Sequence, residues 1–255
     1  MSIMSQQSPM EWHEAVEKVQ PYVYRILTPT MSGTGFLVSH SANGDLLGIA
    51  TAAHVVSYAE QWQQPVRIEH FQCKQTILLP PEKRVVLIDV ARDTAVIVFD
   101  SGTLAPPKNP PELMEEGFHI KVGVEVGWVG FPSVSPPNFC FFSGRVSCVL
   151  EADSAYLVDG VAINGVSGGP AFWLAYDRVI YVGVVASYIP NRVTGEPLPG
   201  LSVVRDVTQF HEIVKQFRSL DDARRQQQAQ ASQPPGDPTQ TRPVGAPEQY
   251  GKDDT

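Results

Sequence analysis

The segment Gly165-Val166-Ser167-Gly168-Gly169-Pro170 places one serine between glycines. Glycine adopts backbone conformations that other residues avoid, so this composition predicts a tight turn with Ser167 exposed on it. Such a turn directs several backbone N–H groups toward one point. Acyl transfer uses that arrangement, because a hydroxyl nucleophile needs donors beside it for the oxyanion that forms when a carbonyl is attacked. Glycine-rich turns with serine are also common in loops, so the interpretation depends on residues elsewhere in the chain.

Two upstream segments supply a histidine and an aspartate. In the first, the apolar runs 33–39 and 46–56 are separated by a polar stretch, which predicts a hairpin that ends at His54. In the second, residues 85–99, Asp93 interrupts an apolar strand pattern, where a carboxylate requires a polar partner. These two residues are the candidate base and acid for the serine.

The three motifs occur in the order His, Asp, Ser and resemble those of the trypsin/chymotrypsin superfamily. They are Thr51-Ala52-Ala53-His54, Asp93-Thr94-Ala95 and the serine segment. Within the superfamily the chain is most similar to HtrA-type (Deg) proteases. This closer likeness rests on four further segments, residues 32–36, 129–132, 143–146 and 200–204. The likeness covers about residues 12–219. It implies an all-β fold, a chymotrypsin-like double β-barrel with short N-terminal and C-terminal helices.

The resemblance assigns a role to each member of the triad. Ser167 is the expected nucleophile, His54 takes its proton and returns it to the leaving amine, and Asp93 orients the imidazole. This chemistry requires neither a metal nor a cofactor, and its partner is a polypeptide substrate. Asp89 is a local rival for the acid; the small residue and strand that follow Asp93 favour the latter, and Asp89 is expected to cap a turn.

The resemblance also predicts an oxyanion hole formed by the N–H groups of Gly165 and Ser167. Val166 stands between them where relatives commonly have Asp or Asn, and a β-branched residue tolerates positive φ poorly. The substrate pocket is assigned to Val161, six residues before the serine, and to Ala186, where many relatives place a serine that bonds the triad carboxylate. An uncharged base at position 161 predicts a preference for small or medium apolar side chains.

Two other interpretations compete with this one. The serine segment also matches the Gly-x-Ser-x-Gly elbow of α/β-hydrolases, but that fold needs its acid and histidine after the serine and a helix at the elbow. Here Pro170 and a strand-like run follow, and the one later histidine is His211 on an expected helix. The second alternative is a catalytically silent or activator-dependent binding module with a protease fold. The complete His, Asp and Ser set favours a serine endopeptidase instead.

Composition excludes several other classes of protein. The chain has 255 residues, 43% of them hydrophobic and 18% charged, as in an ordinary globular protein. A net charge of −8 with no basic stripe argues against nucleic-acid binding. The three cysteines lack metal-type spacing and favour a reducing compartment. The polar N-terminus and the absence of a long apolar run predict a cytoplasmic protein without membrane association. The composition is compatible with an oligomer.

The domain organisation follows from these patterns. Residues 1–220 are expected to form the protease domain, with the first barrel at about 22–100 and the second at about 118–205. Helices are predicted at 11–20 and 207–217, and a proline-rich connection at 101–117. Residues 221–255, rich in Gln, Pro and Gly, are expected to be disordered and contain no PDZ domain.

Overall fold

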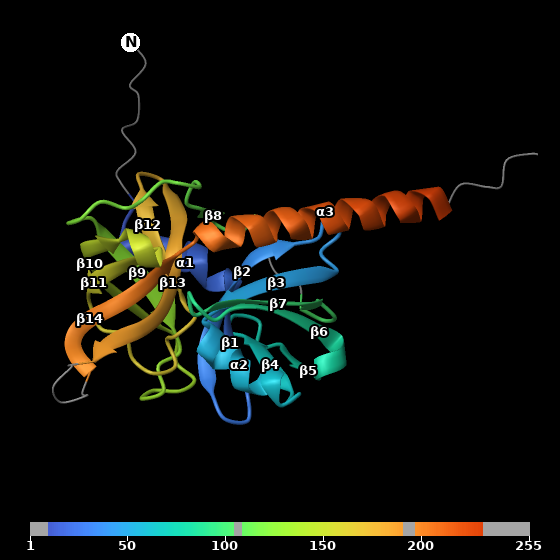
Figure 1. The fold of residues 1–255 in the computed structure, drawn as a ribbon, viewed down its shortest axis with the longest axis horizontal. Helices are drawn as coiled ribbons and strands as arrows, with labels where there is room; N and C mark the ends of the chain where they lie inside the picture. The colour runs from blue at the N-terminus through green and yellow to red at the C-terminus, as the bar shows by residue number, and fades with distance from the viewer. Residues whose placement is uncertain (1–9, 105–108, 191–196, 232–255) are drawn as a thin grey trace, which may run out of the picture.

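The computed structural model describes residues 10–104, 109–190 and 197–231. Two seven-stranded sheets lie side by side, and a long C-terminal helix extends away from them (Figure 1). The first sheet contains β1 (Val23–Leu27), β2 (Ser32–His40), β3 (Leu46–Thr51), β4 (Val66–His70), β5 (Thr76–Leu79), β6 (Arg84–Asp89) and β7 (Thr94–Asp100). The second contains β8 (Glu112–Leu113), β9 (Glu125–Gly130), β10 (Cys140–Leu150), β11 (Ala155–Asp159), β12 (Pro170–Ala175), β13 (Arg178–Pro190) and β14 (Pro197–Asp206). The helices are α1 (Trp12–Val19), α2 (Ala53–Gln61) and α3 (Thr208–Ala231), with short 3₁₀ turns at Gln20–Tyr22, Pro81–Lys83 and Glu151–Asp153.

The strand order shows how each sheet curls into a barrel. The first sheet has the antiparallel order β5-β4-β1-β2-β3-β7-β6. The second has the order β12-β9-β10-β11-β14-β13-β8, and β12 also pairs with β13, which closes the sheet on itself. The expected all-β double barrel is therefore confirmed.

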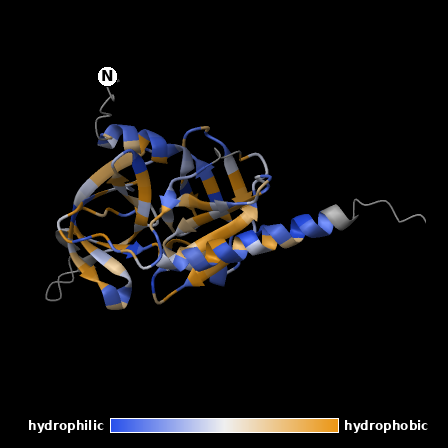
Figure 2. Ribbon diagram, turned by 90° about the horizontal axis from the view of Figure 1, so that it is seen from above, coloured by the Kyte–Doolittle hydropathy of each residue, from blue (hydrophilic) through white to orange (hydrophobic). Residues whose placement is uncertain are grey.

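Alternate residues of the strands point into each barrel and form its apolar interior, so hydrophobic stretches follow the strands while most of α3 is hydrophilic (Figure 2). Phe36 on β2 belongs to the core of the second barrel rather than that of the first. Its ring centroid lies 4.8 Å from that of Tyr181 on β13 and 6.4 Å from that of Phe210 on α3. This aromatic cluster joins the two barrels and the C-terminal helix.

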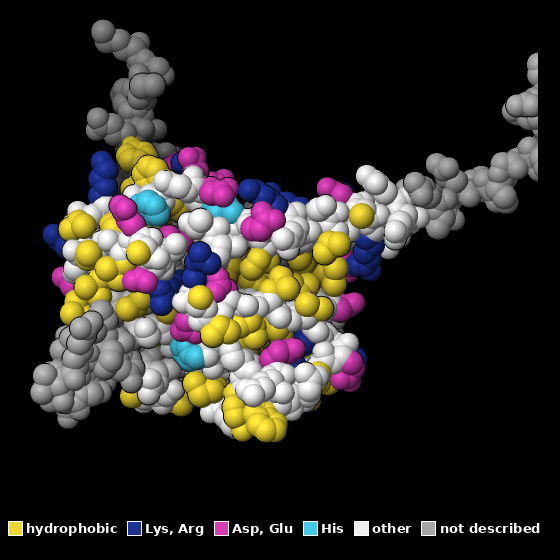
Figure 3. All heavy atoms as spheres, viewed as in Figure 1, with side chains coloured by type: hydrophobic (Ala, Val, Ile, Leu, Met, Phe, Trp, Pro, Cys, Tyr) yellow, Lys and Arg dark blue, Asp and Glu magenta, His cyan; other side chains and the backbone are white. Residues whose placement is uncertain are grey.

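The C-terminal helix differs from its predicted length. The helix predicted at 207–217 is present, and its apolar face, which includes the buried Phe210, Val214 and Phe217, packs against β2. The helix continues to Ala231, so the expected disorder is wrong for residues 221–231. Residues 232–255 lie outside the described residues. Figure 3 shows hydrophobic side chains gathered on the first barrel below α3.

Polar contacts explain why the helix continues. Asp221 is 7% exposed, and its Oδ2 accepts a hydrogen bond from the backbone N–H of Ala42 at 3.0 Å. Three residues further, Arg224 Nη1 lies 3.1 Å from Asp45 Oδ2. Both partners belong to the loop between β2 and β3. The helix is thus fixed to the first barrel beyond the predicted boundary.

Three smaller elements also differ from the prediction. His54 lies in the first turn of α2 rather than in a small-residue turn. Strand-like runs at 139–143 and 145–150 predict two strands, but the structure has one strand there, β10, with an irregularity between Val146 and Cys148. Within the proline-rich connection, β8 makes a two-residue parallel pairing with β13. In the described ranges, no helix is both long enough and apolar enough to cross a membrane.

Candidate active site

Asp93 lies in the turn between β6 and β7 with a φ of +53°, a conformation that aspartate tolerates better than most residues. Its Oδ1 accepts a hydrogen bond from the backbone N–H of His54 at 2.9 Å, and its Oδ2 lies 2.8 Å from His54 Nδ1. Its carbonyl oxygen accepts from the N–H of Ala53 at 3.1 Å. The carboxylate therefore sits at the N-terminus of α2, where the helix dipole favours negative charge.

This contact fixes the protonation of the imidazole. An ionised carboxylate only accepts hydrogen bonds, so Nδ1 of His54 carries a proton and Nε2 is the nitrogen left for another partner. The side chains of His54 and Asp93 are 38% and 26% exposed, so a ligand can reach them.

Asp89, the rival acid, contacts Arg92 instead of the histidine. Its Oδ1 accepts from the backbone N–H of Arg92 at 3.1 Å, and its Oδ2 accepts from the guanidinium at 2.8 Å. The hydrogen bond from the Arg92 side chain holds the pKa of Asp89 below its usual value. Asp89 caps the turn, as the sequence predicts, and Asp93 is the carboxylate at His54.

The serine turn depends on two glycines. Gly165 and Gly168 have φ values of +93° and +87°, in the region that favours glycine. A Cβ at Gly165 would lie 2.3 Å from the Phe131 carbonyl oxygen, and one at Gly168 only 2.1 Å from that of Thr34. Val166 is fully buried in the core and is not among the residues with positive φ. The expected strain at Val166 is therefore absent, because the flanking glycines adopt the unusual conformations.

Two amides of this turn are available to a ligand. The Asn164 carbonyl accepts a hydrogen bond from the N–H of Ser133 at 2.7 Å. Because C=O and N–H point in opposite directions across a trans peptide, the N–H of Gly165 is directed away from Ser133. Neither this N–H nor that of Ser167 donates a hydrogen bond to another residue in the described part of the chain. Both fit the expected oxyanion hole.

Thr34 on β2 fixes the serine turn from the other barrel. Its backbone N–H donates to the carbonyl of Ser167 at 2.8 Å, and its hydroxyl donates to the carbonyl of Gly165 at 2.8 Å. The same hydroxyl accepts from the N–H of Phe131 at 3.1 Å. Its own carbonyl accepts from the Thr51 hydroxyl at 2.7 Å. Thr34 is fully buried, so water cannot replace these bonds.

A cavity of about 310 Å³ brings the histidine and the serine together. It is lined by Met31, His54, Ala162, Ile163, Asn164, Ser167, Ala186 and Ser187. His54 and Ser167 thus come from different barrels and face one space. Among the described residues, Ser167 Oγ forms no hydrogen bond with His54. Catalytic hydrogen bonds are often long before substrate binds.

The specificity pocket differs from the prediction. Ala186 lies in the wall of the cavity as expected, but Val161 is 49% exposed and does not line it. Ala162 and Ile163, one and two residues closer to the serine, take its place. Sequence spacing alone could not identify them, because the loop before the serine has no regular periodicity. Thr34 was also missed as a site residue, although it stands within the quoted Gly33-Thr34-Gly35 motif.

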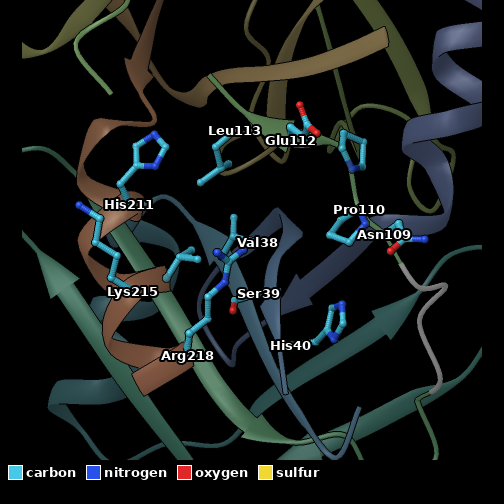
Figure 4. A pocket seen from close by; sticks show the side chains of 12 residues that line it. Val38, Ser39, His40, Asn109, Pro110, Glu112, Leu113, His211, Lys215 and Arg218 are labelled. Atoms are coloured by element: carbon cyan, nitrogen blue, oxygen red, sulfur yellow. The ribbon is translucent and has the colours of Figure 1, made fainter. Parts of the chain in front are cut away.

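A larger cavity lies elsewhere and contains none of these groups. It measures about 610 Å³ and lies between β2, the connection around Pro110 and α3 (Figure 4). Its side chains include His40, His211 and Arg218, but no serine turn faces it. In the described ranges, no three His, Cys, Asp or Glu side chains are placed to hold a metal ion together. The smaller cavity is therefore the candidate active site.

Two β-barrels that contribute a His–Asp pair and a serine turn to one cavity define a protein of the chymotrypsin fold class. The chain belongs to the trypsin-like peptidase domain family, whose model matches residues 33–182 and so includes all three residues. The predicted membership of the trypsin/chymotrypsin superfamily is thus confirmed. No curated protein matches the chain.

Solved structures show the same fold at low sequence identity. The crystal structure of Deg5 has a TM-score of 0.58 and 17% identity, over 80% of this chain and 94% of its own. The serine endoprotease from Yersinia pestis has a TM-score of 0.59 and 15% identity, over 83% of this chain and 70% of its own. The inactive form of the Rv3671c protease has a TM-score of 0.55 and 19% identity, over 81% and 95%. At this identity the likeness extends to the fold alone.

Proposed function

We propose that the protein is a serine endopeptidase with Ser167 as nucleophile, His54 as general base and Asp93 as orienting acid. The observation that carries this proposal is the 2.8 Å contact between His54 Nδ1 and Asp93, which leaves Nε2 for the serine across a shared cavity. The substrate is a polypeptide, since a trypsin-like peptidase domain hydrolyses peptide bonds.

The geometry supports a defined sequence of proton transfers. Ser167 Oγ attacks the scissile carbonyl carbon while its proton passes to His54 Nε2. The N–H groups of Gly165 and Ser167 stabilise the negative oxygen of the tetrahedral intermediate. The imidazolium then gives the proton to the leaving amine, and an acyl-enzyme remains. Water, deprotonated by the same nitrogen, hydrolyses that ester and regenerates the serine.

The lining of the cavity supports an apolar substrate preference. Ala162, Ile163 and Ala186 are uncharged, and none of them can pair with a substrate guanidinium or carboxylate. Burial of an unpaired charge there would be unfavourable, whereas a well-fitting aliphatic side chain gains about 1 to 3 kcal/mol. A peptide library analysed by mass spectrometry should show cleavage after Val, Ala or Leu. Cleavage mainly after Arg or Lys would contradict the assignment of this wall.

The direct test is labelling with a fluorophosphonate probe, which reacts with activated serines. The wild-type chain should be labelled, and Ser167→Ala should lose both the label and hydrolysis of a peptide substrate, by about three orders of magnitude or more. A matched control is Ser187→Ala, which removes another hydroxyl from the same cavity. Retention of turnover by purified Ser167→Ala would refute the serine mechanism.

A second candidate function is an activator-dependent or silent protease-fold binding module. It is favoured by one observation, that Ser167 Oγ forms no hydrogen bond with His54 among the described residues. The same probe separates the two functions, because a silent module stays unlabelled under all conditions. Labelling that appears only after addition of a peptide ligand would identify the activator-dependent form.

We further propose a cytoplasmic location, supported by three free cysteines and testable by cell fractionation.

A further inference from the structure

A second pair of reactive side chains lies outside the candidate active site, at the turn between β4 and β5. Nδ1 of His70 lies 2.5 Å from Sγ of Cys73. Cys73 is exposed, whereas His70 is only 5% exposed and its ring packs 4.9 Å from that of Tyr24. The pair therefore combines an accessible sulfur with an imidazole held in a fixed orientation.

The hydrogen bonds of His70 determine which ring nitrogen carries the proton and which one has a free lone pair for the thiol. Nε2 lies 2.7 Å from the carbonyl oxygen of Pro21, which can only accept, so Nε2 carries the proton. Burial lowers the pKa of His70, so the imidazole is neutral. In the neutral ring Nδ1 is then the acceptor; it lies beside the thiol of Cys73 and also accepts a longer hydrogen bond, at 3.4 Å, from the Cys73 backbone N–H. The side-chain oxygen of Gln75, 3.2 Å from the sulfur, is a second acceptor.

The surroundings suit a negatively charged adduct on the sulfur. Lys74 follows Cys73, and its ammonium lies 4.0 Å from the centroid of the Phe71 ring. A cavity of about 160 Å³ beside the pair is lined by His70, Phe71, Lys74 and Arg25, among others. Glu69 also lines it, but Arg25 neutralises its carboxylate at 3.3 Å. Among the described residues, Lys74 is thus a cation of this cavity with no carboxylate partner, and it follows Cys73 directly in the chain.

The other two cysteines provide a comparison within the same chain. Sγ of Cys140 lies 3.9 Å from the carbonyl oxygen of Asn138, and Sγ of Cys148 lies 3.5 Å from that of Val149. Neither contact is to a base, and both residues are only partly exposed. A carbonyl cannot take up the thiol proton, so these sulfurs lack the assistance that Cys73 has.

We propose that Cys73 and His70 form a thiol–imidazole pair that undergoes disulfide exchange with small disulfides carrying carboxylates, such as oxidised glutathione. The thiol proton passes to His70 Nδ1, and the sulfur attacks one sulfur of the disulfide. A new S–S bond forms as the old one breaks, and the departing thiolate takes the proton from the imidazolium. The products are a mixed disulfide on Cys73 and one free small thiol. The Pro21 carbonyl stabilises the transient imidazolium through Nε2–H.

The experiment compares the three cysteines in the full-length chain. The protein is incubated with oxidised glutathione, quenched with acid at intervals, and the adducts are located by peptide mapping. Cys73 should be modified at least about tenfold faster than Cys140 or Cys148. Equal rates at the three positions, or faster modification of either comparison cysteine, would overturn the proposal without any variant.

Two variants assign the effect to the imidazole. His70→Gln retains a donor for the Pro21 carbonyl but has no base, so the rate at Cys73 should fall about tenfold. His211→Gln is the matched control, because His211 also bonds a carbonyl, that of Met114 at 2.7 Å, and has no cysteine contact among the described residues. It should leave the rate unchanged. An unchanged rate in His70→Gln, with the melting temperature preserved, would exclude the imidazole. Modification of Ser167→Ala at the wild-type rate would show that the pair is independent of the peptidase function.

Discussion

At the scale of single residues, Thr34 controls the geometry of the serine turn without contacting a substrate. Its hydroxyl donates to the Gly165 carbonyl and accepts from the Phe131 N–H in a site that water does not reach. Gly165 and Ser167 supply the proposed oxyanion donors. Thr34 is therefore a positioning residue, whose loss should affect the rate of acylation more than substrate binding.

Thr34→Val tests this role because it keeps the shape of the side chain and removes the hydroxyl. Two buried polar groups then lose a partner, which should lower the free energy of unfolding by about 1 to 3 kcal/mol. The rate of fluorophosphonate labelling should fall by about tenfold or more, with KM for peptides nearly unchanged. Thr34→Ser should restore both properties. Wild-type labelling by a stable Val variant would contradict the assignment.

One prediction tests whether Asp93 or Asp89 is the proposed acid. Asp93→Asn keeps a residue that accepts the φ of +53°, but an amide can donate to His54 Nδ1 and hold the wrong tautomer. Hydrolysis should fall by about three to four orders of magnitude, with little change in melting temperature. Asp89→Asn, whose partner is the exposed Arg92, should be nearly neutral. The reverse pattern would reassign the acid.

Sequence reasoning correctly predicted that His54, Asp93 and Ser167 lie together, because these residue types are chemically distinctive and stand in short local motifs. Their catalytic roles stay a prediction. The assignment of Val161 to the pocket was wrong, because a loop without periodicity does not show which of several neighbouring side chains faces the cavity. Thr34 was not identified from the sequence, because the partners of its hydroxyl lie far away in the chain. A threonine between two glycines does not indicate which distant residues it will bond.

At the scale of elements, α3 shows how a polar segment can be ordered. Residues 221–231 are rich in Ala, Arg and Gln, which are strong helix formers, and they extend a helix already nucleated by the packed turn at Phe210. The polar composition indicated disorder, whereas local helix propensity and the contact of Asp221 with Ala42 favour a helix.

α2 was missed for the opposite reason, because its residues have a high preference for strands. Val55 and Val56 resemble strand residues, yet both are buried residues of α2 itself, whose N-terminus Asp93 stabilises.

Truncation of α3 should therefore destabilise the protein. Removal of all residues after Leu220 deletes Asp221 and Arg224, which bond Ala42 and Asp45. The lost contacts correspond to about 1 kcal/mol, or roughly 2 to 4 °C in melting temperature for a domain of this size. Truncation after Ala231 keeps these contacts and is the control. Identical melting curves for the two truncations would show that residues 221–231 add no stability.

Asp45, the partner of Arg224, also makes the stability of the protein depend on pH. The hydrogen bond from the Ser41 hydroxyl holds the pKa of Asp45 below its ordinary value of 3.8, so ionised Asp45 stabilises the folded state. That contribution is complete above pH 3.8 and is lost as the pH falls through the lower folded-state pKa. Asp45→Asn should thus melt below wild type at neutral pH, and the difference should vanish in strong acid. A difference independent of pH would exclude the carboxylate as its source.

At the scale of the whole molecule, the candidate site exists only where two barrels meet. His54 and Asp93 belong to the first sheet and its helix, whereas Ser167 precedes β12 of the second. Strand-like runs in the sequence predicted the ranges of the two barrels, at about 22–100 and 118–205. Their closure into two barrels came from resemblance, because a pairing such as that of β12 with β9 joins distant segments that no local pattern specifies.

The hydrogen bond from Thr34 to Gly165 spans 131 positions of the chain, and this separation has a consequence for refolding. Hairpins such as β2–β3 close short loops and form early, whereas a contact between distant segments requires a larger loss of chain entropy and forms late. After dilution from denaturant, the far-ultraviolet circular dichroism signal should recover before reactivity toward the fluorophosphonate. Thr34→Val should delay only the second phase. Recovery of both signals in one phase would mean that the barrels fold and dock together, and that a protein chain still being made acquires its reactive serine as soon as its last strand is in place.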